Sequence, residues 1–76
     1  MISMDEIKKM IRGALPDARV EVSDMTGGGD HFEISVVSKH FAGKSLMEQH
    51  KMIFSILESE MDRRIHAVKL KTRSPS

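Results

Sequence analysis

Apolar residues recur at helical spacing near the start of the chain. They are Met4, Ile7, Ile11, Ala14 and Leu15. Ser3 and Glu6 have the spacing of a capping box, in which each residue satisfies a free N–H group of the other at a helix N-terminus. Pro16 follows the last apolar position and cannot continue a helix. The pattern therefore predicts a helix over residues 4–15.

The next two segments alternate between apolar and polar residues, which is typical of strands. Residues 19–24 place Val20 and Val22 on one face, and residues 31–38 do the same with Phe32, Ile34 and Val36. The segment Thr26–Asp30 between them contains three consecutive glycines, which predicts a flexible turn. We therefore expect a hairpin whose apolar faces share one core.

Residues 38–43 predict a short helical turn that ends at Gly43, and a second capping box, Ser45 with Glu48, begins a longer helix. The apolar stripe of that helix is Leu46, His50, Ile53, Phe54, Leu57 and Met61. A last strand starts near Ile65. It buries Val68 and Leu70 and turns Lys69, Lys71 and Arg73 outward, and residues 73–76 are expected to form a frayed tail.

The predicted order is α-β-β-α-α-β in one domain that spans residues 1–76. About 25 residues of helix separate the second strand from the third, a length that suits a crossover between parallel neighbours. We therefore expect an α+β fold with a three-stranded mixed sheet. Helices would cover one face of this sheet, and the other face would be solvated or available to a partner.

Composition narrows the classes of function. The chain has no cysteine, so it forms no disulfide and has no thiol chemistry of its own. Twelve basic and eleven acidic residues leave a net charge of only +1, far from that of a dedicated nucleic-acid binder. The N-terminus lacks the pattern of a secretory signal, and no apolar run approaches the roughly 20 residues that span a bilayer. We expect a cytoplasmic protein that does not bind membranes.

No enzyme motif is complete. Gly43-Lys44-Ser45 is similar to the end of a phosphate-binding P-loop, but Ser38 stands where that motif needs a glycine. The scattered Ser, His and Asp residues form no recognisable catalytic triad. We expect neither enzymatic activity nor a small-molecule substrate.

Basic residues dominate the last strand: residues 63–73 hold five cations and no carboxylate. One interpretation is a solvated strand face. The other is a surface for a protein partner or for nucleic-acid phosphates. Its candidate residues are Lys39, Lys44, Lys69, Lys71 and Arg73.

His31 and His66 both lie where a strand is expected to begin. If those strands are parallel neighbours about 4.8 Å apart, both imidazoles emerge at one edge and could bind one metal centre. Side-chain alternation counts against this, because His66 shares a face with Val68 whereas His31 alternates with Phe32. The alternative is one partly buried structural histidine and one exposed loop histidine. His50 is expected to pack or to form a hydrogen bond within its helix stripe, and His40 is expected to be exposed.

Several segments together resemble the BolA family. They are Val36-Val37-Ser38, Phe41-x-Gly43-Lys44, Gln49-His50-Lys51, Ile65-His66-Ala67-Val68, Lys71-Thr72 and Pro75. The resemblance covers nearly the whole chain and implies a fold similar to class II KH domains. It also implies a monothiol glutaredoxin as partner, either in an apo complex or sharing a [2Fe-2S] cluster.

The resemblance further implies metal ligands. The histidine of the Ile-His-Ala motif, here His66, is a cluster ligand in the family, and a second ligand comes from the loop between the first two strands. Some members carry Cys there and others His, so His31 is the matching candidate in this chain, with Asp30 as a possible oxygen ligand. Glutaredoxin and its bound glutathione would supply the thiolates.

DNA binding is the second function that the resemblance implies, because some BolA proteins are transcriptional regulators. KH domains clamp the nucleic-acid backbone with a GXXG loop. The corresponding segment here, residues 41–45, contains one glycine, and only three phenylalanines and no Tyr or Trp are available for stacking.

Overall fold

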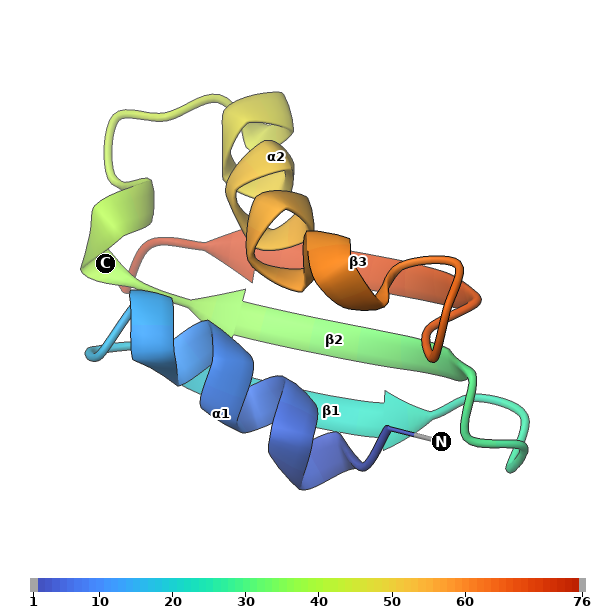
Figure 1. Ribbon diagram of the computed structural model, residues 1–76. Coiled ribbons are helices and arrows are strands. Elements are labelled where there is room, and N and C mark those ends of the chain that lie inside the picture. Colours follow the sequence, from blue (N-terminus) through green and yellow to red (C-terminus); the bar gives the residue numbers. More distant parts are fainter. Residues whose placement is uncertain (1, 76) are drawn as a thin grey trace.

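The computed structural model describes residues 2–75 and has the predicted α+β layout (Figure 1). Its elements are α1 (Met4–Ala14), β1 (Arg19–Asp24), β2 (His31–Val37), η1 (Lys39–Phe41), α2 (Leu46–Leu57), η2 (Glu58–Glu60) and β3 (Ala67–Arg73). The predicted short middle helix is η1, a single 3₁₀ turn. Within residues 2–75, no helix is long and apolar enough to cross a membrane.

The three strands form one sheet in the order β1-β2-β3. β1 pairs with β2 in antiparallel fashion, and β2 pairs with β3 in parallel. Figure 1 shows α1 and α2 over the same face of the sheet. The prediction of a mixed sheet covered on one face is therefore confirmed.

Apolar residues from every predicted element fill the space between helices and sheet. The buried set is Ile2, Ile7, Ile11, Leu15, Ala18, Val20, Phe32, Ile34, Val36, Phe41, Ile53, Leu57 and Ile65. Both capping boxes form, since the Ser3 and Ser45 hydroxyls accept the N–H groups of Glu6 and Glu48. The local sequence signals thus fix where both helices start.

The predicted stripe of α2 is wrong at three positions. Leu46 and Phe54 are 60% and 37% exposed, and Met61 lies beyond the helix, which ends at Leu57. Gln49 is buried instead. Its amide nitrogen donates to the carbonyls of Phe41 and Lys44, and its amide oxygen accepts the Thr72 hydroxyl at 2.7 Å. Because its polar atoms have these partners, a glutamine can occupy the inner face of α2.

The bounds of β3 also differ from the prediction. The strand begins at Ala67 and not near Ile65, because residues 61–65 form a turn in which Asp62 has a positive φ of 64° and its N–H donates to the Ile65 carbonyl. At the other end Arg73 belongs to the strand, and its carbonyl accepts the Ser38 N–H at 3.1 Å. The predicted tail therefore starts at Ser74, and Ser76 lies outside the described residues.

Gly13 and Gly27 differ in backbone conformation, so an added methyl group should have opposite effects on stability at the two positions. An added Cβ meets nothing within 4 Å at either Gly13 or Gly27, but Gly27 has a φ of +78° whereas Gly13 lies in α1. Gly27→Ala should destabilise the protein by about 1–2 kcal/mol, and Gly13→Ala should stabilise it by about 0.5–1 kcal/mol. Urea unfolding of both variants measures the two changes in stability, and effects of the same sign would contradict these backbone assignments.

Candidate metal-binding histidine pair

His31 and His66 come together where β2 and β3 begin. In the parallel register His31 is opposite Ala67, and the Asp30 carbonyl accepts the N–H groups of His66 at 2.7 Å and of Ala67 at 3.2 Å. The two imidazole rings are 5.1 Å apart between centroids and tilted by 58°. His66 precedes the first paired residue of β3, so the alternation of that strand does not direct its side chain. The expected conflict of faces is therefore absent.

The ring separation is compatible with one shared metal ion. A metal–nitrogen bond of about 2.1 Å and a ring radius of about 1.2 Å put each centroid about 3.3 Å from the metal. Two such rings at a tetrahedral angle of roughly 109° have centroids about 5.4 Å apart. The observed 5.1 Å is close to that value.

The turn that leads into β3 fixes the main chain of His66. Its neighbour Ile65 is completely buried. Arg64 donates to both carboxylate oxygens of Glu60, at 2.7 and 2.9 Å, and reaches Glu6 of α1 at 3.2 Å. The hydrogen bond from Arg64 also holds the pKa of Glu60 below its ordinary value. The exposed His66 therefore follows directly after a buried residue, Ile65, and the bidentate Arg64–Glu60 ion pair.

The loop before His31 is organised by Asp24. Its carboxylate accepts the N–H groups of Thr26, Gly27 and Gly29, at 3.2, 2.9 and 2.8 Å. The Met25 N–H closes the hairpin on the His31 carbonyl at 2.9 Å. The prediction of a flexible turn missed this role, although an aspartate just before a glycine-rich turn is a recognised signal for such bonds.

Asp30 contacts the His31 ring directly. Its Oδ1 lies 2.8 Å from Nδ1 of the imidazole. This hydrogen bond is the main cause of a pKa at Asp30 below its ordinary value. The carboxyl is therefore ionised at neutral pH and can only accept hydrogen bonds.

Residues 2–75 by themselves do not complete a metal site. Across residues 2–75, no group of three or more His, Asp or Glu side chains is arranged to hold a metal ion. Structural zinc sites have four protein ligands. The histidine pair, which we define as His31 and His66, can therefore supply at most part of a metal centre.

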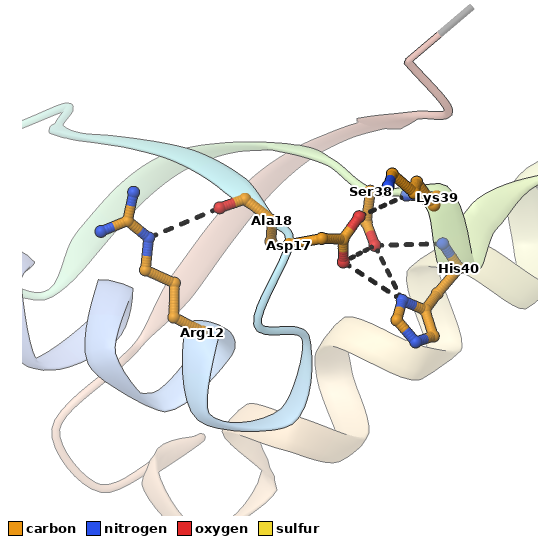
Figure 2. A network of polar contacts seen from close by, with 6 residues as sticks. All are labelled: Arg12, Asp17, Ala18, Ser38, Lys39 and His40. Carbon is orange, nitrogen blue, oxygen red and sulfur yellow. Dashed lines mark hydrogen bonds and ion pairs between the residues drawn. The ribbon is translucent and has the colours of Figure 1, made fainter.

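The other two histidines lie apart from this pair. His50 is partly buried on α2, and its buried Nε2 has no hydrogen-bond partner, so the expected packing is consistent with the structure whereas the expected hydrogen bond is absent at this atom. His40 is exposed, as expected, and belongs to a network with Asp17 and Ser38 at the far end of β2 (Figure 2).

The Asp17–Ser38–His40 network is structural. Asp17 accepts the Ser38 hydroxyl at 2.9 Å, the Lys39 N–H at 2.7 Å and His40 Nδ1 at 3.2 Å (Figure 2). In a catalytic triad the serine and the carboxylate contact different imidazole nitrogens. Here both face Nδ1, and Ser38 is buried. The network joins the start of β1 to the end of β2.

The predicted cations divide into two sets. Lys69, Lys71 and Arg73 project from β3, where Lys69 and Lys71 share Glu33 at 3.7 and 3.9 Å. Lys39 lines a hollow with Arg73, and Arg19, which the sequence analysis missed, lines it too. We call Arg19, Lys39, Lys69, Lys71 and Arg73 the basic stripe. Lys44 lies in a separate hollow with Glu48 and Lys51.

Comparisons with known proteins agree with this architecture. The family model for BolA-like proteins matches residues 8–76. Protein BOLA2 of Arabidopsis thaliana is 39% identical over 72 residues, covering 93% of this chain and 76% of that protein. The DNA-binding transcriptional regulator BolA of Escherichia coli K12 is 30% identical over 79 residues, covering 95% and 75%. The solved BolA domain of Arabidopsis SufE1 has a TM-score of 0.85 at 27% identity, covering 99% and 96%.

The pH dependence of stability tests the role of Asp17. Hydrogen bonds, the strongest from the Lys39 N–H, hold its pKa below the ordinary 3.8. Its contribution is therefore complete above pH 3.8 and is lost as the pH falls through the lower folded pKa. Asp17→Asn should unfold at lower urea than the parent at neutral pH, and the gap should narrow below pH 3.8. A gap that stays constant down to about pH 2 would contradict this.

Proposed function

The chain belongs to the BolA family, and on that basis we propose that it is a non-enzymatic adaptor in iron–sulfur cluster trafficking or iron regulation. It would share a [2Fe-2S] cluster with a monothiol glutaredoxin. The observation that carries this proposal is the approach of the His31 and His66 rings to 5.1 Å at one end of the sheet.

The histidine pair would bind one iron of the shared cluster. Imidazole is a suitable ligand for iron, and pairs of histidines replace pairs of cysteines on one iron of Rieske-type clusters. Such a cluster carries one electron at a time and has a raised reduction potential. The chain's own part is to hold two imidazoles in place, through Asp30 on one side and the Ile65 turn on the other.

The missing ligands define the partner. This chain has no cysteine, so thiolates must come from another molecule. A monothiol glutaredoxin with bound glutathione offers one thiolate from each. We propose that Lys44 and the basic stripe form the surface that contacts this partner. The cytoplasmic location expected from the sequence remains part of the proposal.

DNA binding is the second candidate function. The basic stripe combines three cations of the edge strand β3 with Arg19 of β1 and Lys39 of η1, and it could contact phosphates. The similar Escherichia coli protein is described as a DNA-binding transcriptional regulator. Glu33 and Asp17 lie within the same surface and reduce its positive charge. The net charge of +1 argues in the same direction. We therefore rank this function second.

Reconstitution with a cluster-loaded monothiol glutaredoxin tests the first proposal. Adding the parent chain should produce Rieske-like changes in visible absorption and circular dichroism, because imidazoles replace other ligands on one iron. His66→Ala should abolish these changes. His40→Ala is the matched control, since that exposed imidazole lies at the opposite end of β2, and it should leave them intact.

Two results would overturn the assignment. Spectra that do not respond to the parent chain would reject cluster sharing. Equal spectra for the parent chain and His66→Ala would reject His66 as a ligand. Unchanged spectra together with DNA binding that weakens steeply with salt would favour the regulator function.

A further inference from the structure

We propose that Asp30 is a positioning residue that holds the His31 ring with its proton on Nδ1 and leaves Nε2 as the atom that binds metal. This inference deepens the proposed function and rests on it for the identity of the metal centre. It concerns a carboxylate that does not itself need to touch the metal. Its basis is one short contact and the way the surrounding loop is built.

The contact fixes the tautomer. Asp30 Oδ1 and His31 Nδ1 are 2.8 Å apart, which is a hydrogen-bond distance for a charged acceptor. An ionised carboxylate has no proton to donate, so the hydrogen must be on Nδ1. In neutral imidazole the other nitrogen then carries the free lone pair. Neutral histidine in water favours the opposite tautomer, with hydrogen on Nε2, so Asp30 reverses the ordinary preference.

Asp30 also fixes the main chain of His66, through its own backbone carbonyl. The Asp30 carbonyl accepts the N–H groups of His66 and Ala67. One residue therefore orients the His31 ring with its carboxylate and anchors the His66 backbone with its carbonyl. These two functions are separable, because a substitution at position 30 removes the carboxylate and retains the carbonyl.

The loop leaves room for this carboxylate. A Cβ added at Gly28 would lie 3.2 Å from Asp30 Oδ1 and 3.4 Å from Thr26 Oγ1, so the Asp30 side chain would have to move. On either side of Gly28, Asp24 binds the N–H groups of Gly27 and Gly29. The Asp24 carboxylate therefore holds the glycines on both sides of Gly28, and the absence of a side chain at Gly28 leaves space for the Asp30 carboxylate.

A carboxylate behind a ligating histidine has a known chemical effect. It orients the ring, selects the tautomer and makes the imidazole a more electron-rich ligand. Loss of such a partner typically lowers metal affinity by about 10–100-fold. The alternative role for Asp30, direct ligation through oxygen in place of His31, predicts no particular tautomer of the His31 ring.

Nuclear magnetic resonance of the metal-free chain tests the inference without the partner. In full-length protein with ¹⁵N-labelled histidine at about pH 8, where imidazole is ordinarily neutral, His31 should have its proton on Nδ1. Asp30→Ala should move that proton to Nε2, and Gly28→Ala should move it in part. His66 provides an internal control, since its tautomer should be unchanged. Amide spectra establish that each variant is folded.

The tautomer measurement tests the role of Asp30, and the cluster spectra test the proposed function, so either can fail without the other. A His31 tautomer with hydrogen on Nε2 in the parent chain, or the same tautomer in the parent and Asp30→Ala, would overturn it. In the reconstituted glutaredoxin complex, Asp30→Ala should retain the cluster about 10–100-fold less tightly than the parent. If the tautomer responds to Asp30→Ala while the parent chain leaves the glutaredoxin cluster spectra unchanged, the proposed function fails and the orienting contact remains.

Discussion

Strands β2 and β3 run parallel and start at the same end of the sheet, where the Asp30 carbonyl accepts the N–H groups of His66 and Ala67. The rest of the candidate site depends on this junction. It brings two histidines that are 35 positions apart in the chain to 5.1 Å between ring centroids. An antiparallel pairing of the same strands would put their starting points at opposite ends. The crossover through η1 and α2 is what permits the parallel arrangement.

Much of this could be predicted from local signals. Both capping boxes marked helix starts, and about 25 helical residues between two strands favoured parallel pairing, which placed His31 and His66 together. Sequence could not establish that β3 begins after His66, because that boundary depends on the turn at Asp62 and on Ile65 being buried. The objection from side-chain alternation was therefore wrong.

Two further features depend on contacts between distant residues. The burial of Gln49 requires the carbonyls of the preceding segment and the Thr72 hydroxyl of β3, and no periodicity in α2 indicates those partners. The sequence did not indicate that Arg19 belongs to the basic stripe. The sheet brings it there, because Arg19 of β1 and Arg73 of β3 lie on either side of Val37. Periodicity predicts which face of a helix or strand is apolar. It does not predict which polar side chains from other elements lie beside that face.

The two ends of the sheet have different roles. At one end Asp17 accepts three hydrogen bonds and joins β1 to η1. At the other end two imidazoles are held side by side without enough neighbouring ligands, among residues 2–75, to close a metal site. In the proposed centre the remaining ligands would come from a partner, and this chain would contribute two imidazole nitrogens.

Electron–nuclear double resonance tests this placement most directly. The chain is labelled with ¹⁵N-histidine, combined with an unlabelled monothiol glutaredoxin carrying a [2Fe-2S] cluster, and reduced by one electron. Two strongly coupled nitrogens are predicted, one lost in His31→Ala and the other in His66→Ala. A spectrum of the folded complex without strong ¹⁵N couplings would contradict the account.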